Sequence, residues 1–349
     1  MAAVVAAGDR QRAEREVAAA GDPGQGDALG VGVAEPERPQ RLAGGEEGAD
    51  ADPDPAGAER QRRPAAERVD ARASEHAGKS SAERPAGPPA SPSRNDWPVA
   101  EGDTILRLAR RIEAELGGEP LAVAAPNPRG RAAGVERLDG MRLGRAEARG
   151  KHLLLHFDGL ALHSHLGMSG GWHLYERGES WRRSRGAAWA VLVGPEREAV
   201  QFGGPTLRVL RAAQVDRDPQ LARLGPDVLA PRFDPAPVAA AMRAEPGRGL
   251  GDALLDQRLL AGVGNIFKSE ACFAAAVDPW RPVGDLSDAE LEAVLLAARA
   301  EMGEAADSGR HAPRVYRRRG PCPRCGARIE SRGQGDANRT TYWGPGCQA

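Results

Sequence analysis

The sequence predicts an α+β multidomain protein, in which an N-terminal helix and a β-sandwich precede a helical domain and a zinc-ribbon-like C-terminal β-hairpin. Three observations predict this fold class. Several short segments of alternating polar and apolar residues lie between positions 119 and 215, which is typical of a sandwich. Apolar residues at helical spacing occur on both sides of that region. Cys322 and Cys325, three positions apart near the C-terminus, indicate a metal-binding hairpin.

Residues 1–98 form a leader of different composition. It is rich in Ala, Gly, Pro, Arg, Glu and Asp, and it holds one of the chain's 14 aromatic residues, Trp97. It carries 13 basic and 18 acidic residues, a net charge of −5, whereas the rest of the chain carries 35 and 31, a net charge of +4. Such a leader has too little apolar surface to offset the entropy lost on ordering, so we expect it to be disordered.

The sequence shows no sign of membrane insertion or export. No apolar run approaches the roughly 18 residues that a membrane-spanning helix needs, and the N-terminus lacks the apolar core of a secretory signal. We therefore expect no membrane partner and a cytoplasmic location.

The first element after the leader is a helix. Asp103 and Thr104 are candidate caps, and Gly117 with Gly118 predicts its end. The apolar residues that recur at helical spacing are Ile105, Leu108, Ala109, Ile112 and Leu116.

The predicted strands of the sandwich include residues 151–157, 160–166 and 188–193. Four histidines lie on the first two, and His163 and His165 share one face of their strand. No acidic or cysteine partner stands at ligand spacing nearby, so the pattern argues against a metal at these histidines.

The helical domain contains the most distinctive stretch, residues 254–270. Gly262 and Gly264 tolerate positive φ, so a helix that runs into them and a second helix after Asn265 are joined by a tight turn. With Asn265 as N-cap, the first amides of the second helix are predicted to face an anion, for which a DNA phosphate is the obvious candidate. An ordinary helical hairpin with space-saving glycines is the alternative. A capped helix is expected from about Ser287 to Asp307, and Cys272 is expected in the core.

The C-terminal segment from 308 to 349 is strongly basic, with nine arginines, no lysine and two acids, a net charge of +7. Three of the chain's four cysteines, Cys322, Cys325 and Cys347, lie here, which favours metal ligation over a disulfide framework. A basic hairpin of this kind is suited to neutralising phosphates.

Four motifs, in order, resemble the Fpg/Nei family of DNA glycosylases. Residues 254–270 resemble the family's helix–two-turn–helix element, with Leu-Asp-Gln, Gly-x-Gly-Asn, an aromatic residue and Glu. Val99 to Thr104 resembles the family's opening Met-Pro-Glu-Gly-Asp-Thr, and residues 163–170 and 316–347 resemble two further family segments. The resemblance implies a catalytic β-sandwich domain at 99–223, a DNA-binding domain at 224–312 and a zinc-finger-type hairpin at 313–349.

The resemblance implies three catalytic residues. In the family the amine of the mature N-terminal residue, usually Pro, attacks C1′ of the damaged nucleotide and holds the sugar as a Schiff base; here Ala100 takes that place. Glu101 matches the family's proton donor, and Lys151 matches the residue that contacts the phosphate beside the lesion.

Ala100 can act in this way only as a free N-terminus, because an internal amide nitrogen has no free lone pair. Codons for Val99 include GTG, a bacterial start, so we expect translation to begin there, which makes residues 1–98 upstream sequence.

The resemblance also implies DNA-binding residues. Met168 matches the family's apolar wedge, which enters the gap left by the everted nucleotide. Arg339 matches the hairpin arginine that grips phosphates around the lesion, and Asn265 belongs to the phosphate-facing turn.

The chain departs from the family at two further places. The family's Asp-Pro-Arg-Arg-Phe-Gly run is absent where residues 201–207 stand, which favours the endonuclease VIII branch. Gly344 stands where the family's ribbon has Cys, so the Zn²⁺ site lacks one ligand. Water, His311 or nothing would take its place, and we expect weak or absent zinc, with the hairpin held by its turns and packing.

These features predict a monomeric, bacterial, nucleoid-associated enzyme of base excision repair. It would act as a bifunctional DNA glycosylase and AP lyase that excises oxidised bases from double-stranded DNA and cleaves abasic sites by β,δ-elimination. We expect the excised bases to be pyrimidines. The alternative is a non-catalytic damaged-DNA-binding protein. A third hypothesis, a metalloprotein unrelated to DNA, is supported by the strand histidines alone.

Overall fold

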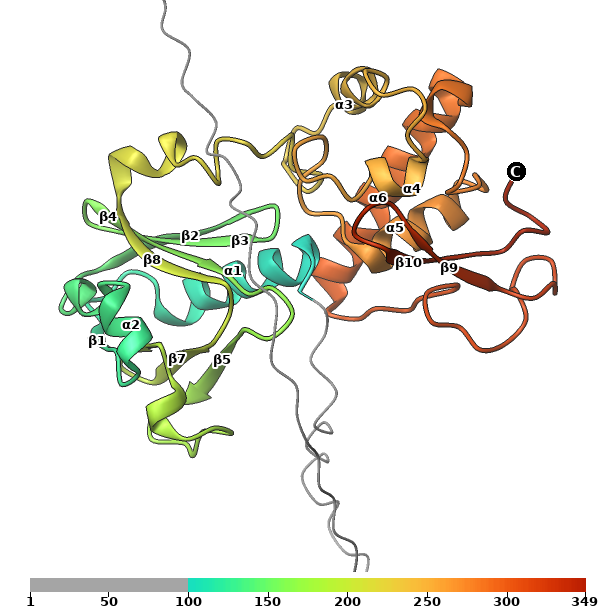
Figure 1. The fold of residues 1–349 in the computed structure, drawn as a ribbon. Helices are drawn as coiled ribbons and strands as arrows, with labels where there is room; N and C mark the ends of the chain where they lie inside the picture. The colour runs from blue at the N-terminus through green and yellow to red at the C-terminus, as the bar shows by residue number, and fades with distance from the viewer. Residues whose placement is uncertain (1–99) are drawn as a thin grey trace, which may run out of the picture. The chain divides into compact units, whose positions relative to one another are not determined.

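The computed structural model describes residues 100–349 (Figure 1). The leader 1–98, for which disorder is predicted, and the expected start at Val99 lie outside the described residues. Within the described part no helix has both the length and the apolar character to cross a membrane. The predicted α+β class is confirmed, with a helix and two sheets, then a helical region, then a hairpin.

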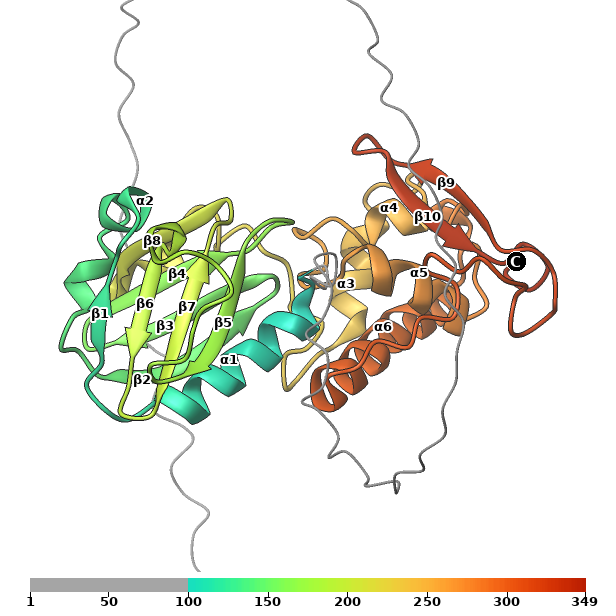
Figure 2. The same cartoon turned by 90° about the horizontal axis from the view of Figure 1, so that it is seen from below.

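Two four-stranded antiparallel sheets form the sandwich, and Figure 2 shows the strands of the first side by side. The first sheet has the order β1 (Ala122–Ala124), β6 (Ala190–Val193), β7 (Arg197–Phe202) and β5 (Gly171–Glu176). The second has the order β2 (Leu143–Arg149), β3 (His152–Phe157), β4 (Leu160–His165) and β8 (Thr206–Arg211). Short connecting helices are α2 (Pro128–Ala132), η1 (Val135–Leu138), η2 (Arg185–Ala187) and η3 (Ala212–Arg217).

Helix α1 (Gly102–Leu116) packs its apolar stripe on the sandwich. Ile105, Ile112 and Leu116 are almost fully buried in one core with residues of both sheets. The predicted caps are wrong, because Glu101 is the N-cap and makes no side-chain capping bond to α1. The Glu101 carboxylate instead accepts from amides at the start of α5, and the Asp103 carboxylate pairs with His311.

The helical region has a core of its own, built mainly from apolar residues between Val228 and Ala305. Its elements are α3 (Pro235–Met242), α4 (Leu250–Ala253), α5 (Asn265–Ala274), η4 (Val283–Asp285) and α6 (Asp288–Ser308). The capped start of α6 is confirmed, since Ser287 and Glu290 form a reciprocal capping box. Cys272 is fully buried in this core, as expected.

The helix expected to run into Gly262 is shorter than predicted. It ends at Ala253, and residues 254–264 form turns. Gln257 explains part of this difference, because its side chain donates to the carbonyls of Leu255 and Val263 and accepts from the Gly262 amide. These bonds hold a looped backbone that helical periodicity cannot reveal.

The C-terminal hairpin pairs β9 (Glu330–Gln334) with β10 (Arg339–Trp343). The ladder is antiparallel, with Arg339 opposite Gln334 and Trp343 opposite Glu330. The strands lie beside α5, since Asn265 Nδ2 donates to the Thr340 carbonyl over 2.8 Å.

Candidate functional site

Glu101 joins the start of α1 to the start of α5. It is fully buried, and its carboxylate accepts hydrogen bonds from the backbone amides of Gly264 (3.0 Å), Ile266 (2.8 Å) and Phe267 (3.3 Å). These amides belong to the N-terminus of α5, where unpaired N–H groups and the helix dipole favour a negative charge. A side chain from one end of the described chain therefore caps a helix far along it.

Two glycines make this contact sterically possible. Gly262 has a φ of +104°, which favours glycine, and its carbonyl accepts from the amide of Gly102 at 3.0 Å. Gly264 has a φ of −120°, so it needs no left-handed conformation. A Cβ at Gly264 would collide with the carboxyl group of Glu101. Glycine is required at position 264 because the Glu101 carboxyl group lies too close for a side chain, and not because of the backbone conformation.

The anion at the start of α5 is thus a carboxylate of the protein. Asn265 was expected to be the N-cap with free amides beside it, but the N-cap is Gly264 and Asn265 is the first helical residue. The amides of Ile266 and Phe267 are already bound to Glu101, so they are not available to a DNA phosphate. This corrects the sequence prediction for the turn.

Burial sets the protonation of Glu101 and Lys151. Burial raises the pKa of Glu101, although the nearby Lys151 ammonium and the hydrogen bonds from Ile266 and Phe267 favour its charged form. Burial likewise lowers the pKa of Lys151, and the carboxylate of Glu101 opposes this shift. Raising the pKa of a carboxyl group in this way makes it a better proton donor near neutral pH.

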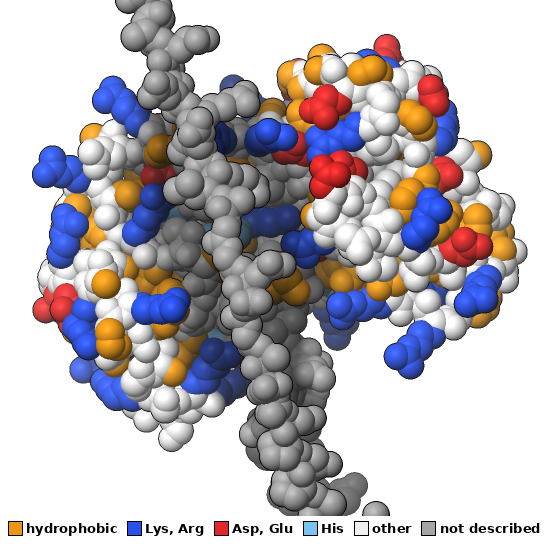
Figure 3. Space-filling model, viewed as in Figure 1, with side chains coloured by type: hydrophobic (Ala, Val, Ile, Leu, Met, Phe, Trp, Pro, Cys, Tyr) orange, Lys and Arg blue, Asp and Glu red, His pale blue; other side chains and the backbone are white. Residues whose placement is uncertain are grey.

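One cavity of about 480 Å³ brings the predicted catalytic and DNA-binding residues together. It lies where the sandwich, the 254–264 loop and the hairpin meet, and Figure 3 shows blue Lys and Arg side chains in this hollow. The six predicted residues in its lining are Ala100, Glu101, Lys151, Met168, Asn265 and Arg339. Arg248 also lines it, but bonds to Asp252 at 2.6 Å and Asp256 at 3.0 Å occupy its guanidinium.

Met168 projects from the turn between β4 and β5. Its side chain is 81% exposed, which makes it the most exposed large apolar residue of the described chain. Arg339 Nη1 lies 4.0 Å from its sulfur, so the wedge candidate and the hairpin arginine approach the same point from different parts of the fold.

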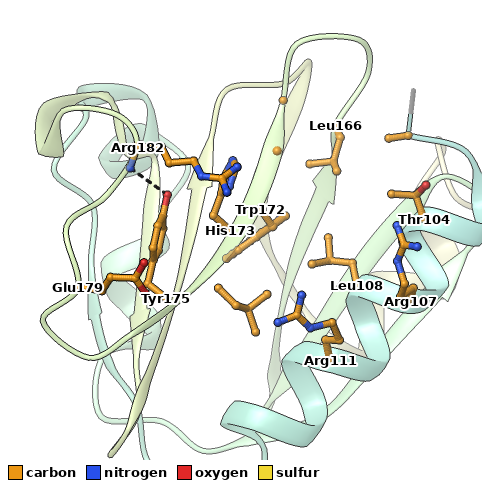
Figure 4. Close-up of a pocket in the computed structure, with 14 residues that line it drawn as sticks. Thr104, Arg107, Leu108, Arg111, Leu166, Trp172, His173, Tyr175, Glu179 and Arg182 are labelled. Atoms are coloured by element: carbon orange, nitrogen blue, oxygen red, sulfur yellow. Dashed lines mark hydrogen bonds between the residues drawn. The ribbon is translucent and has the colours of Figure 1, made fainter. Parts of the chain in front are cut away.

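A second cavity of about 350 Å³ also contains Ala100 in its lining. It lies between α1 and β5, and Figure 4 shows the guanidinium groups of Arg111 and Arg182 pointing into it from opposite walls. Burial and neighbouring arginines lower the pKa of His173 in this cavity to about 4, so its ring is neutral at physiological pH. Ala100 thus lines both cavities.

Two positioning residues were not recognised in the sequence. Asp227 accepts from the amides of Gly150 (2.7 Å) and Leu229, and so holds the turn that carries Lys151. Glu270 accepts from the amides of Arg314, Val315 and Tyr316, which fixes the segment leading to the hairpin. Glu270 belongs to the stretch 254–270 that carries the family resemblance, and Asp227 to residues 224–229, which resemble the family's interdomain connector. Neither motif shows which amides these carboxylates bind.

The three cysteines of the hairpin form a cluster. Their sulfur atoms all lie within 4.8 Å of one another, and they form the only group among the described residues with the geometry to hold a metal ion. His311, considered as a fourth ligand, does not belong to it. Its Nε2 lies 2.6 Å from Oδ2 of the buried Asp103, and its ring contacts Phe267.

The strand histidines form hydrogen bonds with one another and with neighbouring residues. His152 Nδ1 lies 2.9 Å from His163 Nε2, and the Arg208 guanidinium donates to His163 Nδ1. Burial lowers the pKa of His152 to about 3 and that of His163 to about 4. Both rings are therefore neutral members of a buried network.

Comparison with family models gives two matches. Residues 100–201 match the formamidopyrimidine-DNA glycosylase N-terminal domain. Residues 224–316 match the formamidopyrimidine-DNA glycosylase H2TH domain.

Curated relatives cover the same part of the chain. "Probable endonuclease 8 2" of Streptomyces coelicolor is 39% identical over 269 residues, which is 72% of this chain and 94% of that protein. "DNA-(apurinic or apyrimidinic site) lyase Nei2" of Mycolicibacterium smegmatis is 35% identical over 263 residues, 72% of this chain and 99% of that protein.

Solved structures share the fold. Lactococcus lactis Fpg in complex with DNA containing an abasic site has a TM-score of 0.63 at 22% identity, covering 71% of this chain and 99% of that one. MutM (Fpg) of Thermus thermophilus has a TM-score of 0.59 at 28% identity, covering 71% and 98%. Together with the two matched domains and the 39% identity, these likenesses show that the chain belongs to the Fpg/Nei family, the DNA glycosylases and AP lyases of base excision repair.

Proposed function

We propose that this protein is a bifunctional DNA glycosylase and AP lyase that excises oxidised pyrimidine bases from double-stranded DNA. The observation that carries the proposal is the single cavity in which Ala100, Glu101, Lys151, Met168 and Arg339 meet. A nucleophile, a proton donor, cations for phosphates and an apolar wedge are the groups that base excision through an imine needs.

The proposed reaction starts from Ala100 as the mature N-terminus. A terminal α-amine ordinarily has a pKa of about 8, so a useful fraction of such an amine is neutral at physiological pH. The nitrogen lone pair attacks C1′, the bond from C1′ to the base breaks, and Glu101 supplies the proton that the ring oxygen or the departing base takes up. The nitrogen then loses a proton and the C1′–O4′ ring bond breaks, with its electrons going to the ring oxygen, which ends as a protonated hydroxyl. The C=N bond that forms is the Schiff base, from which β,δ-elimination cleaves the strand.

The other residues bind and deform the DNA in this proposal. Lys151 and Arg339 hold the phosphates beside the lesion, Asn265 faces the same cavity, and Met168 fills the gap in the duplex. The second cavity, which Ala100 also lines, is the space into which the everted base turns. The preference for oxidised pyrimidines rests on the missing Arg-Arg-Phe run and on relatives named endonuclease 8.

A non-catalytic reader of damaged DNA is the second candidate. One observation favours it: in the 349-residue chain the nitrogen of Ala100 is part of an amide, and such a nitrogen forms no imine. Lys151, Met168 and Arg339 retain their places in the cavity whichever residue begins the mature chain.

Borohydride trapping on DNA with an abasic site separates the two candidates. A chain that begins at Ala100 is expected to give a covalent complex, and the 349-residue chain is expected to give none. A third chain that begins at Ala100 but carries an acetylated terminus is the matched control, because only its lone pair is lost. If the chain beginning at Ala100 binds abasic DNA yet is never trapped, the enzymatic proposal is wrong.

A further inference from the structure

The three hairpin cysteines form a ligand set suited to a soft divalent ion. Cys322 and Cys347 sulfurs lie 3.6 Å apart, and Cys325 completes a triangle whose sides stay within 4.8 Å. Thiolates in a hairpin of this kind are typical zinc ligands. The donor atoms therefore fit zinc in kind, but they are three where a closed structural site has four.

Gly344 lies beside the three sulfur atoms, at the position where a fourth protein ligand would stand. A Cβ at this buried glycine would lie 3.4 Å from the sulfur of Cys322 and 3.4 Å from that of Cys347, both ordinary contacts. Ile329 Cδ1, at 3.5 Å, forms the other wall. Gly344 has no positive φ in the structure, so a side chain is not excluded by the backbone. A cysteine at 344 would place its thiolate against the cluster.

No neighbouring side chain supplies that ligand in the described part of the chain. Gln348 is committed, since its Oε1 accepts from the Gly344 amide at 2.7 Å and its Nε2 donates to the Val277 carbonyl at 2.9 Å. His311 is bound to Asp103. Cys325 is exposed, so solvent reaches the cluster from its side.

We infer that Cys322, Cys325 and Cys347 form an open zinc site, whose fourth coordination position beside Gly344 is taken by a solvent water molecule. Three protein ligands and one exchangeable water are the arrangement of catalytic zinc sites, whereas ribbons use four protein ligands. The site therefore accepts an added small thiol in place of the water, because thiolate is a preferred zinc ligand. A fourth cysteine at 344 closes it.

Cobalt substitution in the full-length chain tests this inference through absorption of visible light. Unmodified protein is expected to bind one Co²⁺, and 2-mercaptoethanol should shift its bands as one sulfur ligand is added. Gly344→Cys is expected to bind one Co²⁺ with a spectrum that the thiol leaves unchanged. Zinc should bind at least about 100-fold more tightly to Gly344→Cys, because losing even an outer partner costs 10–100-fold in metal affinity.

Two controls separate an open site from general thiol effects. Cys325→Ser should lose the metal, while Cys272→Ala, which removes the cysteine outside the cluster, should keep it. X-ray absorption of the zinc-loaded unmodified protein should count three sulfur ligands and one lighter atom, a result that does not depend on the folding of any variant. A protein that takes up no metal, four sulfur ligands in the unmodified chain, or a cobalt spectrum insensitive to added thiol would each overturn the inference.

Discussion

Glu101 combines a structural and a proposed chemical role in one carboxyl group. Three amides at the start of α5 stabilise its negative charge, while complete burial stabilises its neutral form, and the net result is a raised pKa. The same hydrogen bonds fix the carboxyl oxygens beside Ala100. A proton donor held this rigidly needs no rearrangement before it acts.

Glu101→Gln tests that role with little change in shape. The amide of Gln cannot donate a proton to a leaving group, so single-turnover excision of an oxidised pyrimidine should fall by roughly 10²–10⁴-fold. The assay uses the chain that begins at Ala100, with Glu136→Gln, an exposed carboxyl outside both cavities, as control. Excision by Glu101→Gln at the unmodified rate would contradict the assignment.

The pair formed by His311 and Asp103 predicts a pH dependence of stability. The hydrogen bond that the His311 ring donates to the Asp103 carboxylate raises the pKa of His311 above its ordinary value of 6.5. Because the folded pKa is the higher one, the stabilisation is complete below 6.5 and is lost as pH rises through the folded pKa. His311→Gln should therefore cost about 1.5–3 kcal/mol at pH 6 and clearly less at pH 9.

The free energy of unfolding in urea is measured for the unmodified protein and for His311→Gln, each at pH 6 and at pH 9. His156→Gln serves as control, since His156 contacts Glu147 and lies away from Asp103. Equal losses for His311→Gln at pH 6 and pH 9 would show that the ring is not charged in the folded protein.

Residue identities were predictable from the sequence where motifs are long, and their contacts were not. The resemblance of residues 99–104 to the family's opening singled out Glu101, yet no local pattern shows that its carboxylate caps α5. The N-cap prediction for Asn265 was wrong for this reason. A pairing between residues 163 positions apart comes from tertiary packing alone.

At the scale of elements, a chain of buried polar contacts holds the hairpin on α5. Lys268 Nζ donates to Thr341 Oγ1 at 2.7 Å, Thr341 Oγ1 donates to Gln334 Oε1 at 2.6 Å, and Gln334 Nε2 donates to the Pro279 carbonyl. Lys268 is fully buried, and burial lowers its pKa to about 8. None of the hairpin cysteines takes part in these hydrogen bonds.

Lys268→Met is expected to loosen the hairpin and weaken DNA binding by roughly tenfold. Methionine keeps the volume but leaves the Thr341 hydroxyl without its donor, a loss of about 1.5 kcal/mol. Binding to abasic duplex DNA is measured for Lys268→Met, Thr341→Val and the double variant. Thr341→Val removes the bond to Lys268 and also the one to Gln334, so the double variant should be little worse than Thr341→Val alone. Fully additive losses would contradict the coupling.

The long elements were predictable, and the turns between them were not. Helix α6 follows its capping box and apolar spacing, and the sandwich follows the alternation of its strands. Residues 254–264 have the apolar spacing of a helix, but Gln257 diverts the backbone into turns. Side-chain to backbone hydrogen bonds compete with helix formation at such places, and apolar periodicity does not report them.

On the scale of the whole molecule, the leader and the rest of the chain carry net charges of opposite sign. Residues 1–98 carry a net charge of −5, and the remainder, with nine arginines after residue 307, carries +4. The larger cavity takes one basic side chain from the sandwich, Lys151, and one from the hairpin, Arg339. Affinity for DNA should therefore depend strongly on salt.

Arg339→Ala is expected to weaken binding about equally for all duplex sequences. If Arg339 contacts one phosphate, the slope of log affinity against log salt should become shallower by about 1. The measurement is a salt titration of duplex binding, with Arg137→Ala, an exposed arginine outside both cavities, as control. An unchanged slope would show that Arg339 makes no phosphate contact.

Met168 is open to oxidation, because it is 81% exposed and its side chain contains a thioether. Hydrogen peroxide converts methionine to its sulfoxide, which is polar and poorly suited to lying between bases. The oxidants that generate the lesions would thus also disable the residue proposed to open the helix around them. Brief peroxide treatment of the chain that begins at Ala100 should lower its excision rate, and the same chain carrying Met168→Leu should be spared. Equal loss in both would place the sensitive group elsewhere.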